Sequence, residues 1–413
     1  MPHRVVVTGI GTVNPLALDT AGTWAAMLAG KSGIAPITAF DTTGFDTTIA
    51  GEVNGFDPAN YMDRKEARRT DRFSHFAIAA AREALSQAQF TIDASNAADV
   101  GVMIGSGIGG ILTLEEQIHV LRDKGPGRVS PFIVPAMIAN AAGGIVSILT
   151  GAQGPMFAIV SACSSGADAL GESFEIIRRG DATAMLAGGT EAAVSPISIA
   201  GFNAARALST RNDDPQGASR PFDSERNGFV MSEGAAILFL EELEAAKARG
   251  ATIIAEMVGY GATADAHHMT APLEDGSGGV RAMRRAMEKG GIAPAGVSYI
   301  NAHGTSTKLN DKTETLVIKT VLGEHAATTP ISSTKSMVGH MIAGAGAIEA
   351  AVCALAIRDG MVPPTINYRT PDPECDLDYV PNQARKVAVD VALSNSLGFG
   401  GHNSCLAFRK YRE

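Results

Sequence analysis

The sequence has few of the features that mark disulfide-bonded, nucleic-acid-binding or membrane-spanning proteins. Its four cysteines, Cys163, Cys353, Cys375 and Cys405, lie far apart without metal-type spacing, so a reduced, cytoplasmic setting is expected. Its 34 lysines and arginines are outnumbered by 43 aspartates and glutamates. The net charge of −9 argues against a general nucleic-acid binder. The sequence contains no run of 18 apolar residues, so no membrane span is expected.

Glycine and short apolar runs are what the sequence has in abundance. It holds 46 glycines in 413 residues, and 45% of its residues are hydrophobic. Apolar runs bounded by glycine predict buried strands, and the segments between them have helical patterns, as in Phe73–Gln87 and Ala345–Asp359. The alternation predicts an α/β fold. The predicted strands are Val5–Ile10, Val100–Ile104, Phe157–Ser161, Met185–Gly188, Ala235–Leu240, Ile253–Val258, Ser298–Asn301 and Val391–Asn395.

Two stretches of the sequence look like counterparts. Arg4-Val-Val-Val-Thr-Gly-Ile-Gly lies near the start, and Ile253-Ile-Ala-Glu-Met-Val-Gly-Tyr-Gly begins the last third, and each is a strand ending in Gly-x-Gly. The similarity suggests a duplicated domain, although chance resemblance of two strand–turn units would give the same pattern. Under duplication, residues 1–250 and 251–413 would form the two halves.

The most informative window is Phe157-Ala-Ile-Val-Ser-Ala-Cys163-Ser-Ser-Gly-Ala-Asp-Ala-Leu. A predicted strand ends there, Cys163 lies at the turn, and a helix of small residues follows. The positive end of that helix favours thiolate over thiol, which predicts a lowered pKa for Cys163. The alternative is a buried structural cysteine, and physical reasoning alone supports the two interpretations equally.

Two histidines occupy comparable positions beside small-residue turns. They lie in Asn-Ala-His303-Gly-Thr-Ser-Thr and in Lys-Ser-Met-Val-Gly-His340. Together with a cysteine in a third such position, they favour nucleophilic catalysis by a Cys/His combination. A structural role is the simpler interpretation of a lone histidine. Metal binding is the rival, but neither histidine has a close third ligand in the sequence. His267-His268 could be ligands, although an exposed loop pair is the simpler interpretation.

At these residues the chain resembles the β-ketoacyl-acyl-carrier-protein synthases of the synthase II type, the condensing enzymes that elongate bacterial fatty acids. Several spaced motifs match in the expected order, and the resemblance covers essentially the whole chain. The motifs are Ser161-Ala-Cys-Ser-Ser-Gly, Asn301-Ala-His-Gly-Thr-Ser-Thr, Ser333-Thr-Lys-Ser-Met-Val-Gly-His, Asn395-Ser-Leu-Gly-Phe-Gly-Gly-His-Asn403 and Arg220-Pro-Phe-Asp-Ser-Glu-Arg-Asn-Gly-Phe-Val.

The resemblance implies a fold, a reaction and partners. The fold would be thiolase-like, with duplicated αβαβα halves that form a five-layered core, and the enzyme would be a homodimer. The reaction would be the decarboxylative Claisen condensation of a cysteine-bound acyl group with malonyl-acyl carrier protein, which yields 3-oxoacyl-acyl carrier protein and carbon dioxide. No metal or redox cofactor would be required.

The resemblance also implies roles for individual residues. Cys163 would accept the acyl group, and His303 and His340 would bind the malonyl thioester carbonyl. The backbone N–H groups of Cys163 and Phe399 would form an oxyanion hole, with the Phe399 ring as a gate. Lys335 would support the histidines, with Glu314 as its ionic partner.

Further residues are assigned by the same resemblance to three binding surfaces. The substrate would contact Ile108, Phe202, Thr270, Thr305 and Thr307. Acyl carrier protein would contact Lys65, Arg68, Arg69 and Arg206, although a basic helix face is ordinarily just solvated. A structural Na+ or K+ would lie near Asn301, Glu349, Ser394 and Asn395.

Two departures from the family pattern lie beside these motifs: His402 replaces a common threonine, and Lys308-Leu309-Asn310 replaces a proline-containing stretch. They put loop dynamics or substrate preference in question.

A free-standing polyketide-type ketosynthase would share the nucleophile and both histidines, but a chain without acyltransferase or carrier segments favours fatty-acid synthesis. A thiolase would lack the two-histidine pattern, and a non-catalytic ketosynthase partner subunit would lack Cys163.

Overall fold

A mixed sheet of ten strands runs through the protein, in the order β10-β9-β13-β14-β8-β1-β7-β6-β4-β5. The computed structural model describes residues 2–412. Residue 1 of the first predicted half and residue 413 of the second lie outside the described residues. The strands of the first half are β1 (Val5–Val13), β4 (Val100–Gly105), β5 (Met156–Phe157), β6 (Ala184–Glu191) and β7 (Gly234–Glu242). Those of the second half are β8 (Ala255–Ala264), β9 (Tyr299–Asn301), β10 (Ile331–Ser332), β13 (Val391–Gly398) and β14 (His402–Arg409).

The second half of the sheet repeats the first. In each half the third strand lies at the edge, followed by the second, fourth, fifth and first. The pairing directions also repeat: the three outer strands are parallel, and the fifth strand is antiparallel to its neighbours. The first strands of the two halves, β1 and β8, pair with each other. Because one sheet joins the halves, the division after residue 250 stays a prediction, although it falls between α10 (Leu243–Ala248) and β8.

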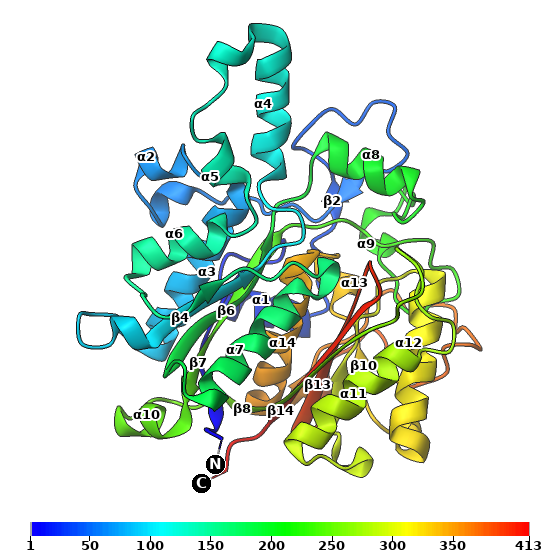
Figure 1. Ribbon diagram of the computed structural model, residues 1–413. Helices are drawn as coiled ribbons and strands as arrows, with labels where there is room; N and C mark the ends of the chain where they lie inside the picture. The colour runs from blue at the N-terminus through cyan, green and yellow to red at the C-terminus, as the bar shows by residue number, and fades with distance from the viewer. Residues whose placement is uncertain (1, 413) are drawn as a thin grey trace.

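Helices cover and separate the two parts of the sheet (Figure 1). The helix α3 (Arg72–Ala88) packs on β1 and β7, and α11 (Ser277–Gly290) packs on β8 and β14, with α12 (Lys308–Leu322) beside it. Between the two parts lie α7 (Ser165–Arg179) and α14 (Ala343–Asp359), which pack against each other. The result is the five-layered α/β arrangement that the resemblance implied.

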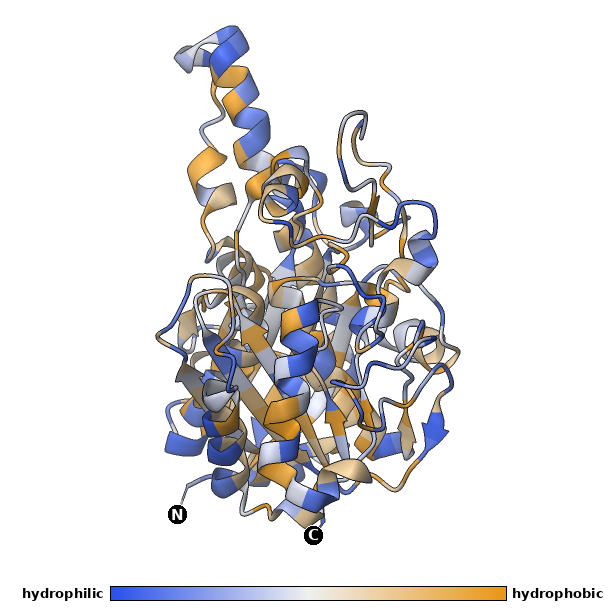
Figure 2. Ribbon diagram, turned by 90° about the vertical axis from the view of Figure 1, so that its right-hand side faces the viewer, coloured by the Kyte–Doolittle hydropathy of each residue, from blue (hydrophilic) through white to orange (hydrophobic). Residues whose placement is uncertain are grey.

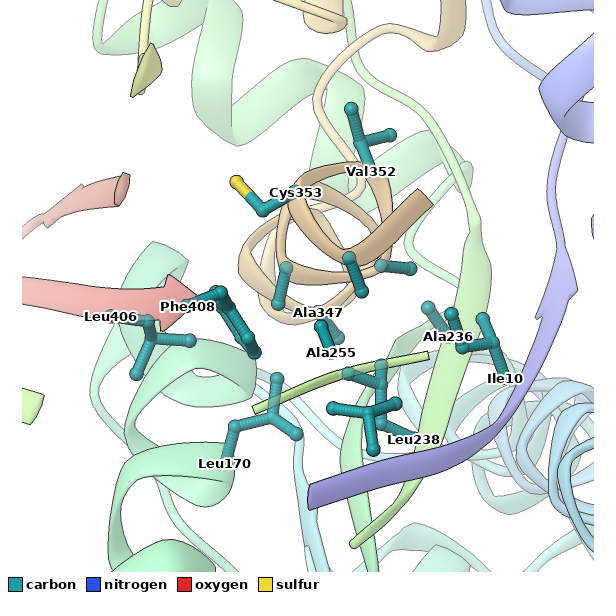
Figure 3. Packing of buried hydrophobic residues seen from close by; sticks show 14 of the residues in the cluster. Ile10, Leu170, Ala236, Leu238, Ala255, Ala347, Val352, Cys353, Leu406 and Phe408 are labelled. Atoms are coloured by element: carbon teal, nitrogen blue, oxygen red, sulfur yellow. The ribbon is translucent and has the colours of Figure 1, made fainter. Parts of the chain in front are cut away.

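The middle layer is built from small residues, which let its two helices approach closely. A Cβ atom on Gly166 of α7 would lie 2.3 Å from the carbonyl oxygen of Ala343 in α14, so glycine is required there. Figure 3 shows side chains of α14, such as Ala347, surrounded by Leu238 of β7 and Phe408 of β14. The helix α14 is buried over nearly its whole length, as its alanine-rich sequence predicts.

One predicted strand, Phe157–Ser161, is wrong beyond its first residue. The strand β5 ends at Phe157, and the chain then leaves the sheet. The Ile159 carbonyl accepts a hydrogen bond from Ser106 N (3.2 Å), and the Ser161 hydroxyl donates to Asp168. The segment therefore keeps one backbone hydrogen bond to the residue after β4, while the Ser161 side chain bonds to Asp168 of α7.

The remaining elements are short or peripheral, apart from α4 (Ile111–Lys124), which projects beyond the sheet (Figures 1 and 2). Within residues 2–412, none of the helices is both long and apolar enough to cross a membrane. The others are α1 (Thr20–Leu28), α2 (Arg64–Ala67), α5 (Ile133–Met137), α6 (Ala141–Thr150), α8 (Pro196–Ala204), α9 (Pro215–Ala218), α13 (Lys335–Val338), β2 (Ala35–Pro36), β3 (Ile49–Ala50), β11 (Met361–Val362) and β12 (Arg385–Lys386).

Candidate active site

A cavity of about 750 Å³ gathers many of the predicted site residues. It is lined by the predicted nucleophile, both histidines and the predicted gate, and by all five predicted substrate contacts. These residues are Cys163, His303, His340, Phe399, Ile108, Phe202, Thr270, Thr305 and Thr307. Arg206 and the departures His402, Lys308, Leu309 and Asn310 line the same cavity. Segments from both halves of the chain therefore meet at one site.

Cys163 lies on a sharp turn at the start of α7. It belongs to the 3-10 turn Ala162–Ser164, and the preceding residue, Ala162, has a positive φ of 52°. This left-handed conformation costs an alanine roughly 1 kcal/mol. Two hydrogen bonds hold the turn: Ser161 N donates to Ser165 Oγ (2.9 Å), and Ser165 Oγ donates to the Ala162 carbonyl (2.7 Å). The turn directs the thiol towards the cavity at the helix N-terminus.

The expected lowering of the Cys163 pKa is wrong for the free enzyme. Burial raises the pKa of this thiol to about 11, and the positive charge of Lys335 and the N–H groups of Phe399 and Cys163 only partly oppose the rise. Desolvation disfavours the charged thiolate more than these favourable groups stabilise it. The sequence shows the helix N-terminus, which favours thiolate, but not the burial that outweighs it.

The raised pKa predicts how Cys163 reacts with a neutral alkylating reagent such as iodoacetamide. Only the thiolate reacts, and its fraction rises about tenfold for each pH unit below the pKa. With a pKa of about 11, the alkylation rate should climb steadily from pH 7 to pH 9, measured by intact mass. A plateau below pH 8 would contradict the raised pKa, and Cys163→Ser shows which label belongs to this residue.

The two histidines are buried and lie next to each other. Their ring centroids are 5.5 Å apart at an interplanar angle of 85°. Lys335 Nζ lies 3.2 Å from His303 Nδ1. An ammonium group can only donate, so His303 Nδ1 accepts and its proton is on Nε2. Neither ring nitrogen of His340 has a hydrogen-bond partner within residues 2–412, which leaves its ring free to bind a substrate.

Both histidines are neutral at physiological pH. Burial holds the pKa of His303 and of His340 well below the usual value, and the nearby Lys335 charge acts in the same direction. A neutral imidazole offers one N–H donor and one acceptor. The pair can therefore donate hydrogen bonds to an oxygen that develops negative charge, without carrying a buried positive charge in the resting state.

The predicted ion pair between Lys335 and Glu314 is wrong. Lys335 Nζ instead pairs with Glu349 of α14 and also donates to the His303 carbonyl (2.7 Å). Glu314 of α12 accepts from the backbone N–H groups of His303 and Gly304, both at 2.8 Å. Both of its oxygens are engaged by the turn that carries His303, so Glu314 holds the histidine through its backbone.

The comparisons with known proteins agree with this geometry. The family model described as "Beta-ketoacyl synthase, N-terminal domain" matches residues 3–246, and the "Beta-ketoacyl synthase, C-terminal domain" matches residues 254–369. The chain belongs to the β-ketoacyl synthase family. It is 55% identical over 409 residues to a Synechocystis protein named "3-oxoacyl-[acyl-carrier-protein] synthase 2", covering 99% of this chain and 98% of that one. A Staphylococcus aureus protein with the same name is 53% identical over 408 residues, with the same coverage.

Solved ketosynthase structures resemble this β-ketoacyl synthase over its whole length. The ishigamide ketosynthase/chain length factor has a TM-score of 0.94 at 35% identity and covers 100% of both chains. A type II PKS ketosynthase in complex with its acyl-carrier protein has a TM-score of 0.92 at 39% identity, again with 100% coverage of both chains. A β-ketoacyl synthase from Burkholderia phymatum has a TM-score of 0.92 at 38% identity and covers 99% of this chain and 100% of its own.

The predicted carrier-binding residues of the synthase are not all in one place. Arg206, which follows α8, lines the cavity. Lys65 and Arg68 lie at α2 and are exposed, whereas Arg69 stacks over the Phe132 ring at 4.7 Å. Figure 1 places α2 and α8 on opposite sides of α4. Within one chain, Arg206 and the α2 residues therefore form separate basic surfaces.

The four predicted cation ligands each have a buried side-chain atom with no hydrogen-bond partner among residues 2–412. The atoms are Asn301 Oδ1 and Nδ2, Glu349 Oε2, Ser394 Oγ and Asn395 Oδ1. Buried polar atoms are ordinarily satisfied, so a cluster without partners needs an explanation. Neutral oxygens with one carboxylate are suitable ligands for a hard cation.

The sequence analysis did not identify Glu349 as the partner of Lys335, although a signal was present. It is the one charged residue in the first 15 residues of α14, among alanine, glycine and other apolar residues. A carboxylate in so apolar a helix is expected to be paired when buried. The position of Lys335 opposite it depends on tertiary packing and could not be obtained from spacing.

Proposed function

We propose that this synthase elongates fatty acids by decarboxylative condensation of a Cys163-bound acyl group with malonyl-acyl carrier protein. The observation that supports the proposal is the joint placement of Cys163, His303 and His340 around one cavity, with two neutral imidazoles beside the thiol. The names of the relatives with 53–55% identity agree with this reaction. The roles below are our assignments for this chain.

In the first stage, the acyl group moves to Cys163. The thiol loses its proton and the sulfur attacks the acyl thioester carbonyl, which expels the carrier's pantetheine thiolate, and that thiolate takes up a proton. The N–H groups of Phe399 and Cys163, which face the sulfur, stabilise the tetrahedral oxyanion. Losing one such donor typically costs roughly 3 kcal/mol. The Phe399 ring lies at the same place and controls access.

In the second stage, malonyl-acyl carrier protein binds and loses carbon dioxide. The electron pair of the broken C–C bond forms an enolate, whose oxygen accepts hydrogen bonds from His303 Nε2–H and from the His340 ring. Donors that act only on this developing charge lower the barrier selectively. The enolate carbon then attacks the Cys163 thioester and expels the sulfur, which takes up a proton.

Intact-mass analysis tests the proposed reaction directly. The synthase is incubated with hexanoyl-acyl carrier protein, then with malonyl-acyl carrier protein. We expect one hexanoyl group on the enzyme, followed by release of 3-oxooctanoyl-acyl carrier protein and one carbon dioxide for each product. A product extended by several unreduced two-carbon units would support the polyketide alternative, the class named for one of the similar solved structures. Absence of an acyl-enzyme would refute the proposal.

We further propose that the synthase is a homodimer joined at β5. This strand lies at the edge of the sheet, and its Phe157 side chain is 58% exposed. An exposed apolar edge strand can pair with the same strand of a second protomer. A twofold axis between the two β5 strands would join the two sheets into one. Apolar residues of α4 and α5, including Ile118 and Val134, are also exposed. Sedimentation tests this: a monomer at micromolar concentration would contradict it.

We also propose that acyl carrier protein docks on the basic residues Lys65, Arg68, Arg69 and Arg206. Exposed charges of this kind mainly raise the association rate. A dimer would supply these residues from both protomers, which accounts for their separation within one chain. Reversing the charge of Lys65 and Arg68 should lower the rate of reaction with carrier-bound substrates. The loss should be larger at low salt concentration than at high salt concentration. Equal losses with small thioester analogues would contradict the assignment.

A structural Na+ or K+ is proposed at Asn301, Glu349, Ser394 and Asn395, whose unpartnered atoms support it. Their oxygens would hold the ion and fix β9 and β13 beneath the histidines. A cation at a hundredfold excess over its Kd raises the free energy of unfolding by about 2.7 kcal/mol. For a chain of this size this corresponds to a rise in Tm of about 3 °C. We expect that difference between potassium chloride and choline chloride at equal ionic strength.

A pair of serine variants checks the cation prediction. Ser394→Ala should remove the difference in Tm between the two salts, because it deletes one proposed ligand. Ser173→Ala is the matched control, since the Ser173 hydroxyl is also buried and has no partner in the described part of the chain, but it lies on α7. The same Tm in both salts for the wild-type protein would exclude the site.

A further inference from the structure

Glu191 is a buried carboxylate to which the proposed chemistry gives no role. It lies at the end of β6 and is completely buried. Burial raises its pKa to about 7, and the hydroxyl and N–H groups that donate to it oppose the rise. A buried carboxylate at the wall of a substrate cavity is costly unless its oxygens are well satisfied, so its partners indicate what it holds.

Most partners of Glu191 belong to one turn, although Ala343 N at the start of α14 also donates to Oε2, at 3.5 Å. Ser106 Oγ donates to Glu191 Oε1 (2.8 Å), Gly107 N to Oε2 (2.7 Å) and Ile108 N to Oε1 (3.3 Å). The turn closes on itself through a hydrogen bond from Gly109 N to Ser106 Oγ (2.9 Å). One carboxylate therefore fixes a turn that follows β4 directly.

The same turn forms part of the cavity wall. Gly107 and Ile108 both line the cavity that contains Cys163. Ile342 lies against Gly107, since a Cβ on Gly107 would be 3.0 Å from Ile342 Cγ2 and 3.1 Å from Glu191 Oε2. Ile342 has a positive φ of 46°, an outlier for a β-branched residue. Glu191, the turn and the strained Ile342 thus interlock on this side of the cavity.

The second half of the chain uses a comparable device. Glu314 accepts from two consecutive N–H groups, of His303 and Gly304, in the turn that follows β9. Because β9 in the second half corresponds to β4 in the first, the two carboxylates hold equivalent turns. One of these turns carries His303, and the other carries Ile108.

We propose that Glu191 is a positioning residue that sets the length of the acyl chain accepted by Cys163, because it holds Ile108 in the cavity wall. The inference rests on the proposed acyl transfer to Cys163. On this proposal a long acyl chain reaches Ile108 in the cavity wall and displaces it, which breaks charge-assisted hydrogen bonds in a buried site, where they are strongest. A short chain leaves Ile108 in place.

Glu191→Gln tests the proposal because it keeps the shape of the side chain. The amide NH2 group of glutamine would point at N–H groups of the turn and cannot accept hydrogen bonds from them. The turn is then held by fewer hydrogen bonds. We expect the ratio of hexadecanoyl to hexanoyl transfer from carrier protein to Cys163, measured as single-turnover rate constants, to rise about tenfold, the effect of one lost hydrogen bond to a charged group.

Glu83→Gln is the matched control. Glu83 also holds backbone N–H groups, of Thr12 (2.8 Å) and Thr20 (2.7 Å), but it does not line the cavity of Cys163. Its substitution should leave the ratio unchanged. If Glu191→Gln lowers both rate constants equally, or leaves their ratio unchanged, the proposal is overturned. No hexanoyl transfer by the wild-type enzyme would instead refute the proposed function.

Ile108→Ala shows whether Glu191 acts through the proposed side chain. Adding Glu191→Gln to Ile108→Ala should not change the ratio further, because the displaced side chain is already absent. A full tenfold addition would contradict the positioning role. If Glu191→Gln does not fold, judged by its thermal unfolding, Ser106→Ala replaces it, since it removes one donor to Glu191 and should raise the ratio in the same direction.

Discussion

Replacing Cys163 with serine is expected to eliminate the acyl-enzyme and to lower condensation by more than about a thousandfold. A hydroxyl is a weak nucleophile at neutral pH, and the burial that raises the thiol pKa to about 11 disfavours an alkoxide still more. The measurement is intact mass after incubation with acyl-acyl carrier protein, together with the rate of 3-oxoacyl product formation.

Cys375→Ser is the control for the nucleophile. Cys375 is also a free, buried cysteine, but within residues 2–412 the cavity is lined by Cys163 alone among the four. This variant should acquire the acyl group like the wild-type enzyme. Acylation of Cys163→Ser to the wild-type extent would show that the acyl group is carried elsewhere.

His303→Ala and His340→Ala are expected to lower carbon dioxide release from malonyl-acyl carrier protein by about 10²–10³-fold each, the typical effect of removing one donor to a developing oxyanion. Acylation of Cys163 should fall much less, because that stage uses the backbone N–H groups of Phe399 and Cys163. Labelled carbon dioxide and acyl-enzyme formation are measured separately, so the two stages can be distinguished.

The protonation state of His303 allows a sharper version of this test. Its Nδ1 accepts from Lys335, so the donor to substrate is Nε2–H. Glutamine can place an amide N–H near the Nε2 position, so His303→Gln should retain more carbon dioxide release than His303→Ala. His119→Ala, at an exposed position of α4, is the control and should behave as wild type. Normal release by both alanine variants would contradict the assigned roles.

Most of the fold could be predicted because its signals are local. The strand β6 contains the predicted Met185–Gly188, and α14 contains the predicted Ala345–Asp359, since apolar runs and helical periodicity are read within one window. The sequence analysis missed β10 and β14. The strand β10 has only two residues, and β14 begins with the polar His402 and Asn403, so that its apolar run is limited to residues 405–408.

The site was predicted as a set of residues but not as a set of contacts. Cys163, His303 and His340 were found because each lies at a strand end or beside a small-residue turn. Glu314 was assigned to Lys335, and the pairing of Lys335 with Glu349 was missed, since each glutamate lies in a helix and only packing decides which buried group it meets. The raised pKa of Cys163 was missed for the same reason, because burial is not a local property of the sequence.

The repeated strand order makes the synthase modular in evolutionary terms. Cys163 lies between the third strand of its half, β5, and the helix α7, whereas His340 lies between the third strand of the other half, β10, and α14. One copy of the repeat thus supplies the thiol that we propose to carry the acyl group, and the other supplies both imidazoles. Changes in the turn after β4 can alter which fatty chain is held while the carbanion-forming apparatus of the sister copy stays intact. Substrate choice can therefore change through one half of the chain while the other half keeps the residues of the reaction.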